Sequence, residues 1–421
     1  MLSAQQRAII TATVPALRAH GETITRTFYG AMLSAHPELL DYFNPANQRA
    51  EGGQARSLAA SVLAYAANID HLDRLGGLVE RIATKHVSLE ILPEHYPIVG
   101  RHLLGAIAEV LGEAATPEIL EAWGAAYGQL AEVMIGRERA LYDETSTQPG
   151  GWAGFRPFRV ARKVAESGSM TSFHLVPADG GPLADFRPGQ YVSVRLQPPG
   201  SAHAQVRQYS LSAAPDGRQY RITVKREGAP AGLPDVAPGL ISNFLHDHVA
   251  EGDILPVHAP VGDFVLDEAS GRPVVLIGGG AGITALLPML ERLATASTRE
   301  VVLLRALRGR DQHAFADRVR ALAGLRTGVR SVTWYEVADA SDRLDGYCDA
   351  LGRLDAELIR QHLPAGEAEF YYCGPVGFMA AIEQALDTLG VPAARRHSEA
   401  FAPDPSFVVE APDAEAMARA G

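Results

Sequence analysis

The feature of the sequence that most constrains its fold is a short apolar run that leads into a glycine-rich turn. Residues 274–277 are Val-Val-Leu-Ile, residues 278–284 are Gly-Gly-Gly-Ala-Gly-Ile-Thr, and residues 285–293 have the apolar spacing of a helix. A buried strand, a turn and a helix in this order are typical of a parallel α/β unit. Glycines also let the backbone approach a pyrophosphate held at a helix N-terminus. The turn therefore predicts a dinucleotide site, with a tight turn that binds nothing as the alternative.

Three further apolar runs continue this pattern toward the C-terminus. Together with the first they predict four buried strands, at residues 274–277, 301–304, 331–335 and 369–373. The second run lacks the acidic residue expected in an NAD site and is followed instead by arginines, at Arg305, Arg308 and Arg310. Arginine can pair with a 2′-phosphate, so NADPH stands beside NADH as a candidate. Solvated surface charge is the alternative for these three residues.

A cysteine closes the fourth apolar run. Cys373-Gly374-Pro375 places a thiol at the C-terminal end of a strand, in the crevice where an open α/β sheet binds its ligand. A nicotinamide ring would lie there. The alternative is a small buried side chain without a role in binding.

The frequency of proline and glycine, which interrupt helices, changes near residue 148. The first 147 residues contain 18 prolines and glycines, and the remaining 274 contain 50. Apolar spacing predicts helices in the first part, at residues 9–19, 23–33, 58–69, 72–86, 98–111 and 117–142. His20, before Gly21, and His36, before Pro37, are expected at helix ends. Short β-rich runs then predict an antiparallel barrel, at residues 158–164, 171–177, 191–196, 207–211, 220–225 and 253–258.

This order predicts a multi-domain chain: an all-α domain, an antiparallel β-barrel and a parallel α/β domain. The formal charge of −11 disfavours nucleic acid or an anionic membrane as the main partner. The two cysteines, Cys348 and Cys373, form no zinc or disulfide pattern, which favours a reducing compartment. No stretch reads as a membrane span, and the N-terminus lacks the pattern of a secretory signal. A cytoplasmic protein is expected.

Two motifs in the barrel region suit an anionic ligand with a flat ring. Arg207-Gln208-Tyr209-Ser210 combines an arginine that can clamp a phosphate with a tyrosine that can stack on a ring. Further along, Gly239 is followed by Ser242 at the start of an expected helix, another device for binding anions. A surface strand and a helix cap are the alternative for either motif taken alone.

With the glycine turn and Cys-Gly-Pro following in order, residues 152–403 resemble the ferredoxin–NADP reductase superfamily. That resemblance implies FAD on the barrel and a nicotinamide nucleotide on the α/β domain. The FAD site that it implies comprises Tyr191, Arg207, Gln208, Tyr209, Ser210, Gly239, Ser242 and a stacking Phe401. The NAD(P) site that it implies comprises Gly278, Gly279, Gly280, Ala281, Gly282, Ile283, Thr284, Cys373, Gly374 and Pro375.

One histidine of the helical part stands out by its position. His86 continues the apolar face of the helix expected at residues 72–86, where a buried core histidine is the alternative to a ligand. The pairs Phe28-Tyr29 and Tyr42-Phe43 suit either a flat cofactor or an ordinary core. Their placement resembles the bacterial globin fold, in which a phenylalanine at a corner between helices wedges the porphyrin. Phe43 matches that corner, and His86, 43 residues later, matches the proximal ligand.

The chain as a whole resembles the flavohaemoglobins, the bacterial nitric oxide dioxygenases, over about residues 1–403. Family motifs occur in all three parts, as at Asn47-Gln48-Arg49, Lys85-His86, Pro93-Glu94-His95-Tyr96, Ala126-Tyr127-Gly128 and Pro149-Gly150-Gly151-Trp152. The domains that the resemblance implies are a globin domain with haem b (1–147), a linker (148–152), an FAD-binding barrel (153–268), an NAD(P)-binding domain (269–403) and a disordered tail (404–421).

The resemblance to this family implies an activity. NAD(P)H would reduce FAD, FAD would reduce the haem, and haem-bound dioxygen would oxidise nitric oxide to nitrate. The implied protein is a monomer, with a lipid as a further occupant of the distal pocket. Two other hypotheses are a haem-based gas or redox sensor and an NAD(P)H:flavin reductase that acts on other acceptors. Every domain is assigned to electron delivery, so no output module is left for a sensor.

Family roles extend to individual residues of the helical part. His86 is implied as the axial ligand of the haem iron, with Tyr96 and Glu138 as a relay to it. A surface partner for Arg137 or Arg139 is the alternative for Glu138. Lys85 is implied to tune the redox potential, and Tyr29 to donate a hydrogen bond to bound oxygen. The residues implied for the distal wall are Phe28, Phe43, Gln54 and Leu58.

Some positions depart from the family pattern. The segment between Arg49 and Gln54 holds one residue more than expected, and residues 228–238 form a longer segment than usual. Three alanines replace other residues of the family, Ala285, Ala400 and Ala402. These departures leave FAD and NAD(P)H binding expected, but put the flavin potential and the turnover in question.

Overall fold

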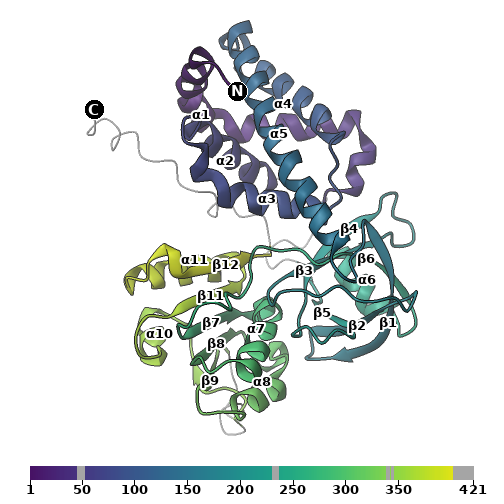
Figure 1. Cartoon of the computed structure of the whole chain (residues 1–421), viewed down its shortest axis with the longest axis vertical. Coiled ribbons are helices and arrows are strands. Elements are labelled where there is room, and N and C mark those ends of the chain that lie inside the picture. The colour runs from purple at the N-terminus through teal and green to yellow at the C-terminus, as the bar shows by residue number, and fades with distance from the viewer. Residues whose placement is uncertain (45–52, 230–236, 338–341, 343–345, 402–421) are drawn as a thin grey trace. The chain divides into compact units, whose positions relative to one another are not determined.

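The computed structural model describes residues 1–44, 53–229, 237–337, 342 and 346–401. The chain forms two compact units, one containing Met1–Glu144 and Pro199–Val206, the other Thr145–Pro198 and Arg207–Phe401. Helices, an antiparallel sheet and a parallel sheet follow one another along the chain in the predicted order (Figure 1). The domain boundaries expected from the sequence stay predictions.

Helices form the first part of the chain. Their bounds are α1 (Ala4–Ala35), η1 (Pro37–Asp41), α2 (Gln54–Ala67), η3 (Leu72–Leu75), α3 (Gly76–Ser88), α4 (His95–Leu111), η4 (Gly112–Ala114) and α5 (Pro117–Thr147). Apolar side chains form a common core, which includes Ile10 and Met32 of α1, Ile107 of α4 and Trp123 of α5. Among the described helices, none combines the length and the apolar character needed to cross a lipid bilayer.

A single helix replaces the two that the sequence predicts between residues 9 and 33. His20 and Gly21 lie inside α1, so the prediction of a helix end there is wrong. Gly21 is buried, and a Cβ atom added to it would lie 3.4 Å from Cβ of Ala59 in α2. Glycine costs a helix about 1 kcal/mol, and the close packing of α1 on α2 outweighs that local preference. The helix end expected at His36 is confirmed, because His36 caps α1.

Six antiparallel strands form the next part. Their bounds are β1 (Phe155–Ala165), β2 (Met170–Pro177), β3 (Tyr191–Leu196), β4 (Gln205–Ser210), β5 (Tyr220–Lys225) and β6 (Ile254–His258), with α6 (Leu240–His248) between the last two. The strand order is β4-β3-β6-β1-β2-β5, and a bridge between Leu211 and Ile222 joins the two ends of the sheet into a barrel. The predicted ranges of β3 and β5 match the structure. Buried side chains such as Phe158 and Val194 fill the interior.

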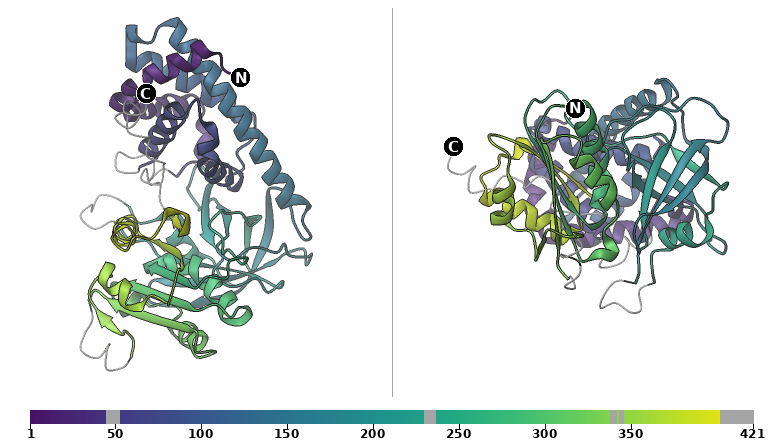
Figure 2. Two further views of the ribbon diagram at one scale, coloured as in Figure 1. Left: turned by 60° about the vertical axis from the view of Figure 1, so that its left-hand side comes forward. Right: turned by 90° about the horizontal axis from the view of Figure 1, so that it is seen from below.

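The last part is a parallel sheet with helices on both faces. Its elements are β7 (Val274–Gly279), η5 (Gly280–Gly282), α7 (Ile283–Ala296), β8 (Val301–Leu307), η6 (Arg310–Gln312), α8 (Ala316–Ala323), β9 (Val329–Tyr335), β10 (Ala350–Leu351), α10 (Ala356–His362), β11 (Glu369–Gly374), α11 (Val376–Thr388), η7 (Ala393–Arg395) and β12 (Arg396–Ala400). Helices α7 and α8 cover one face, and α10 and α11 cover the other (Figure 1, Figure 2). The strand order is β10-β9-β8-β7-β11-β12. It changes direction between β7 and β11, where sheets of this type bind ligands.

Two edge strands of this sheet have no apolar run to predict them. β10 is only two residues long, and every residue of β12 is partly exposed. β12 is defined by its parallel pairing with β11, in which Arg396 lies opposite Phe370 and Ala400 opposite Gly374. A strand that depends on a distant partner in this way leaves little local pattern in the sequence.

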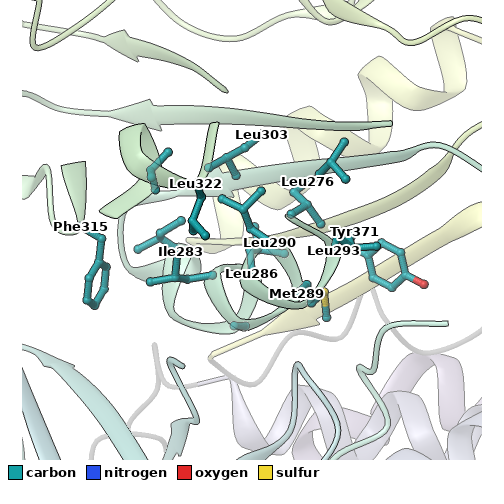
Figure 3. Packing of buried hydrophobic residues seen from close by; sticks show 14 of the residues in the cluster. Leu276, Ile283, Leu286, Met289, Leu290, Leu293, Leu303, Phe315, Leu322 and Tyr371 are labelled. Atoms are coloured by element: carbon teal, nitrogen blue, oxygen red, sulfur yellow. The ribbon is translucent and has the colours of Figure 1, made fainter. Parts of the chain in front are cut away.

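Helix α7 is buried on nearly all sides. Leu286, Leu290 and Leu293 belong to an apolar cluster that fills the space between this helix and the parallel strands (Figure 3). The same cluster contains Met170 and Phe264 from the barrel region. Because the barrel and the parallel sheet share this core, they belong to one compact unit.

We expect Gly100→Ala to destabilise the helical unit. A Cβ atom at Gly100 of α4 would lie 2.5 Å from Cε1 of Tyr127, so one of the two residues must shift. The expected loss in the free energy of unfolding is about 1–3 kcal/mol, measured from the urea midpoint of the helical circular-dichroism signal. Gly105→Ala, in the same helix, is the control and is expected to be neutral or stabilising. Apart from the adjacent residues and the backbone of its own helix, the described residues place no atom within 4 Å of a Cβ added there. Equal midpoints for Gly100→Ala and the wild type would contradict this packing.

Candidate functional site

His86 lies in the last turn of α3, and side chains of two other helices hold its ring. Its Nδ1 atom is 2.7 Å from Oε1 of Glu138 on α5 and 3.2 Å from the hydroxyl of Tyr96 on α4. A neutral imidazole that donates from Nδ1 presents a lone pair at Nε2, which can then bind a metal. The side chain is 32 % exposed, so part of the ring is accessible.

Glu138 is a buried carboxylate. Its side chain is 2 % exposed, and its Oε1 accepts a second bond from the hydroxyl of Tyr96 at 2.5 Å. The alternative of a surface partner for Arg137 or Arg139 is therefore wrong. Arg137 instead donates two bonds to Glu80 of α3, at 2.6 and 2.8 Å. This bidentate pair ties α3 to α5 beside the relay.

Two further tyrosines attach the relay helices to their neighbours. Burial and the Glu138 carboxylate raise the pKa of Tyr96, so its hydroxyl stays a donor. The hydroxyl of Tyr127 donates to the backbone oxygen of Tyr96 at 2.7 Å, and that of Tyr142 donates to the backbone oxygen of Ile91 at 2.8 Å. The structure thus brings the three residues of the predicted relay together from α3, α4 and α5.

The residues predicted for the distal wall meet around Tyr29. Its ring lies beside those of Phe28 and Phe43, with centroid distances of 4.8 and 5.7 Å. Burial raises the pKa of Tyr29 to about 12, and a hydrogen bond with Gln54 opposes part of that rise. Leu58 follows Gln54 by one turn of α2 and packs against the same core. Phe28 is more deeply placed than the others, since only 2 % of it is exposed.

Part of the distal segment lies outside the described residues. The motif at residues 47–49 and the extra residue expected before Gln54 belong to residues 45–52. Lys85 is described, and it is exposed next to His86 in the last turn of α3. A cation there interacts favourably with the helix C-terminus, and its effect on a redox potential stays a prediction.

The barrel motif lies on β4. Arg207 and Tyr209 point to one side of the strand, and Gln208 and Ser210 point to the other. Burial lowers the pKa of Arg207 and raises that of Tyr209, although both residues stay partly exposed. Tyr191, on the adjacent strand β3, is buried. The strand therefore presents a guanidinium and a phenol ring together, as a ligand with a phosphate and a flat ring requires.

Gly239 and Ser242 form the N-terminus of α6. Gly239 is the N-cap, and the hydroxyl of Ser242 donates to its backbone oxygen at 3.1 Å. A Cβ atom at Gly239 would lie 2.7 Å from that hydroxyl oxygen, so a larger residue would displace it. At the other end of the helix, Nζ of Lys163 donates to the backbone oxygens of His246 and Val249, at 2.7 and 2.6 Å. Lys163 thereby stabilises the C-terminus of the helix whose N-terminus suits an anion.

The glycine-rich turn and the cysteine motif meet at the ends of β7 and β11. Gly278 lies directly opposite Cys373 in the sheet. A Cβ atom at Gly282 would overlap the backbone oxygen of Cys373, and Gly280 has a φ of 51°. Glycine is therefore needed both for the turn and for its close approach to β11.

The remaining residues of the NAD(P) prediction surround this turn. Ile283 and Thr284 open α7, and the hydroxyl of Thr284 donates to the backbone oxygen of Ala281 at 2.9 Å. Gly374 ends β11, and Pro375 is the exposed N-cap of α11. The structure brings these residues to one end of the sheet, where its strand order changes direction.

Cys373 and Phe401 differ in exposure. Cys373 is 0 % exposed, and burial together with the nearby Glu399 carboxylate raises the pKa of its thiol well above the usual range. The alternative of a small buried residue therefore stays open for Cys373. Phe401 is 49 % exposed and follows Ala400, which pairs with Gly374 at the end of β12. An exposed ring at this end of the sheet is available for stacking on a ligand.

One arginine that was a candidate for a 2′-phosphate is buried. Arg305 is 1 % exposed and donates to the backbone oxygen of Ala314 at 2.7 Å, and burial lowers its pKa to about 10. Its assignment to a phosphate, or to solvated surface charge, is therefore wrong. Arg308 and Arg310 are exposed, and the guanidinium of Arg310 lies 3.7 Å from the ring centre of Tyr347. The choice between NADH and NADPH stays open at these two residues.

Comparison with known proteins decides the family. A globin family model matches residues 26–134, and a model of the oxidoreductase NAD-binding domain matches residues 276–384. A flavohemoprotein of Deinococcus radiodurans is 59 % identical over 408 residues, which cover 97 % of this chain and 98 % of the relative. This chain belongs to the flavohemoprotein family. A second flavohemoprotein, from Bordetella pertussis, is 49 % identical over 404 residues, which cover 95 % of this chain and 98 % of the relative.

Solved structures agree with the flavohemoprotein architecture. A crystal structure of flavohemoglobin from Malassezia yamatoensis with bound FAD and heme matches with a TM-score of 0.82 and 30 % identity, over 95 % of this chain and 99 % of that chain. The FAD/NAD binding domain of nitric oxide dioxygenase from Vibrio cholerae matches with a TM-score of 0.53 and 42 % identity, over 59 % of this chain and 99 % of that domain. The predicted family and fold class are confirmed, and the flavohemoprotein is an oxidoreductase.

Two supporting contacts of this flavohemoprotein have no clear signal in the sequence. The pair Arg137–Glu80 joins residues 57 positions apart, and only the packing of α3 on α5 reveals it. Phe378 of α11 packs against both glycine motifs, because a Cβ atom at Gly279 or Gly374 would lie 2.8 or 2.5 Å from its Cδ1 atom. A charged residue among the apolar residues of a helix is a visible signal, and Glu291 of α7, which follows Leu290, provides one.

We expect both thiols of the folded flavohemoprotein to resist Ellman's reagent. Cys348 and Cys373 are both buried, and the raised pKa of Cys373 further reduces the thiolate that would react. After unfolding in guanidinium, two thiols per chain should react. Reaction of one thiol in native buffer would contradict the burial, and Cys348→Ala would show which residue is responsible.

Proposed function

We propose that this flavohemoprotein is a nitric oxide dioxygenase, which oxidises nitric oxide to nitrate with dioxygen and electrons from NADH or NADPH. The observation that carries the proposal is the setting of His86, whose Nδ1 is held by the buried carboxylate of Glu138. A hydrogen-bonded carboxylate makes an imidazole ligand more electron-donating, which favours activation of dioxygen over its reversible carriage. A reductase in the same chain supports the same proposal, because such activation consumes electrons.

Three groups fit the residues at the sites: haem b, FAD and NAD(P)H. When bound, they supply hydride transfer, the division of its two electrons, and dioxygen chemistry at iron. His86 would hold the iron through Nε2. Arg207, Tyr209 and the start of α6 would hold FAD, and the turn at residues 278–284 would hold the nucleotide pyrophosphate. The FAD and heme in the Malassezia relative support two of the three assignments.

The relay orients the ring of His86. Nδ1 of His86 and the hydroxyl of Tyr96 donate to the same oxygen of Glu138, since a carboxylate can only accept. The other oxygen, Oε2, is buried without a hydrogen-bond partner among the described residues. The carboxylate charge therefore acts mainly on these two donors, and its effect is stronger than in water because the site is desolvated.

Tyr29 supplies a polar group for the gas substrate. A pKa of about 12 keeps its phenol protonated at neutral pH, so it would donate a hydrogen bond to an oxygen atom. Phe43 and Leu58 supply apolar surface that suits small neutral gases. A lipid in this pocket stays a prediction, as do the monomeric state and the cytoplasmic location.

We expect His86→Ala to abolish nitric oxide consumption that depends on NAD(P)H and dioxygen. Loss of the imidazole removes the proposed ligand, so the rate should fall to that without enzyme, measured with a nitric oxide electrode. Reduction of the flavin by NADH should persist, because His86 lies in the helical unit. His20→Ala, which removes an exposed histidine of α1, is the control. Unchanged consumption in His86→Ala would favour a flavin reductase that acts on other acceptors.

We expect Tyr96→Phe and Glu138→Gln to keep the Soret band and to lower turnover. Each variant weakens the hydrogen bonding of Nδ1 without removing Nε2, and changes of this kind cost about 10- to 100-fold in activity. Glu138→Gln should have the larger effect, because it removes the charge that both donors share. Turnover equal to that of the wild type in both variants would refute a role of the relay in the reaction.

A further inference from the structure

Glu291 is a buried charge that the proposed electron path does not use. It lies in the second half of α7, where 5 % of it is exposed and the neighbouring residues Leu290 and Leu293 belong to the apolar cluster of Figure 3. A carboxylate in such surroundings is destabilising unless hydrogen bonds and opposite charge compensate for the lost hydration. Its partners therefore show what the residue holds in place.

The partners of Glu291 come from the barrel as well as from the α/β part of the same compact unit. Oε2 accepts a hydrogen bond from the backbone N–H of Ala214 at 2.7 Å, and Oε1 accepts one from Nε of Arg318 in α8 at 2.7 Å. Nη2 of Arg221 in β5 lies 4.0 Å from Oε1. One carboxylate thus joins α7 to the chain that continues from β4 and to β5.

Arg221 extends this network along the barrel. Its guanidinium donates to the backbone oxygen and the hydroxyl of Ser212, and it lies 4.9 Å from the ring centre of Phe315, which precedes α8. Burial lowers the pKa of Arg221, and the Glu291 carboxylate opposes that effect. Arg221 therefore holds Ser212, and Glu291 holds Ala214.

The segment that Glu291 holds borders a cleft. Residues 213–216 line a cleft of about 350 Å³, together with Arg221, Glu291 and Arg318. One side of the segment thus faces this cleft, and the Ala214 N–H bonds to Glu291 of α7. The cleft itself is a poor ligand site, since both arginines are already engaged with the protein.

We propose that Glu291 is a positioning residue for hydride transfer from NAD(P)H to FAD. It holds the chain that follows the flavin motif at residues 207–210 against α7, which begins at the nucleotide turn. Hydride transfer requires reacting atoms about 3–3.5 Å apart, and a displacement of about 1 Å costs about 100-fold in rate. The inference rests on the proposed function, because it assumes that the two cofactor sites exchange a hydride.

The test is the rate of flavin reduction in Glu291→Gln, measured by stopped flow under anaerobic, saturating NADH. The amide keeps the size of the side chain, but it has no charge and only one acceptor oxygen for the two donors. We expect the rate constant to fall about tenfold or more, with a change of less than about twofold in the apparent Kd for NADH. Hydrogen exchange in peptides covering residues 213–216 should become faster, which reports the loss of the contact independently of activity.

Glu300→Gln is the matched control. Glu300 pairs with Arg330 at 2.9 Å on the α/β part, and both side chains are partly exposed, so the change removes a carboxylate from the same fold without touching the barrel. Its reduction rate and its exchange at residues 213–216 should equal those of the wild type. If Glu291→Gln loses thermal stability while its reduction rate stays at the wild-type value, the role is purely structural and the proposal is wrong.

Arg318→Gln decides the case in which Glu291→Gln does not fold. Half of the Arg318 side chain is exposed, so its loss is tolerated more easily, and it removes one donor from Glu291. A slower flavin reduction with unchanged NADH binding and faster exchange at residues 213–216 supports the proposal. A wild-type rate despite faster exchange at residues 213–216 overturns it. Failure of the wild type itself to reduce its flavin with either NADH or NADPH would refute the proposed function instead, and hydrogen exchange would still test the contact.

Discussion

The buried carboxylate of Glu138 is the interaction on which the helical unit and its site both depend. A carboxylate that is 2 % exposed is destabilising unless hydrogen-bond donors surround it, and His86 and Tyr96 supply them from α3 and α4. The same two bonds also orient the imidazole, and in the proposed function they would make it a more electron-donating ligand. Tyr127 and the Arg137–Glu80 pair then connect the relay to the rest of the helices.

The candidate nucleotide site of the second unit depends on the close approach of two backbone segments rather than on a buried charge. Gly282 lies so near the backbone of Cys373 that no side chain fits, and the strand order changes direction at this point. The barrel and the parallel sheet share the core around α7, and Glu291 adds a polar contact within it. The sites proposed for flavin and nucleotide are thus built on elements that share one core.

The local pattern of apolar residues and glycines predicts the helices, strands and turns that their own residues specify. β3 and β5 have the predicted bounds, and the turn after β7 and the Cys-Gly-Pro motif at the end of β11 both occur where expected. Local pattern is misleading where a distant neighbour decides. Gly21 reads as a helix end, but α2 packs against it, and β12 exists only through its pairing with β11. Arg305 has the sequence position of a surface cation, but it is buried and bonds to the backbone oxygen of Ala314.

The sequence by itself determined the family and the order of the three architectures, and it supplied the residues predicted for each site. These depend on residue types at fixed spacing, which a chain carries with it before it folds. Only the tertiary structure decided which groups touch: that Glu138 is buried against His86, that Arg305 is not available to a ligand, and that Glu291 reaches Ala214. The physical reason is that burial and hydrogen bonding join residues that are far apart in the chain, and no local spacing specifies those pairs.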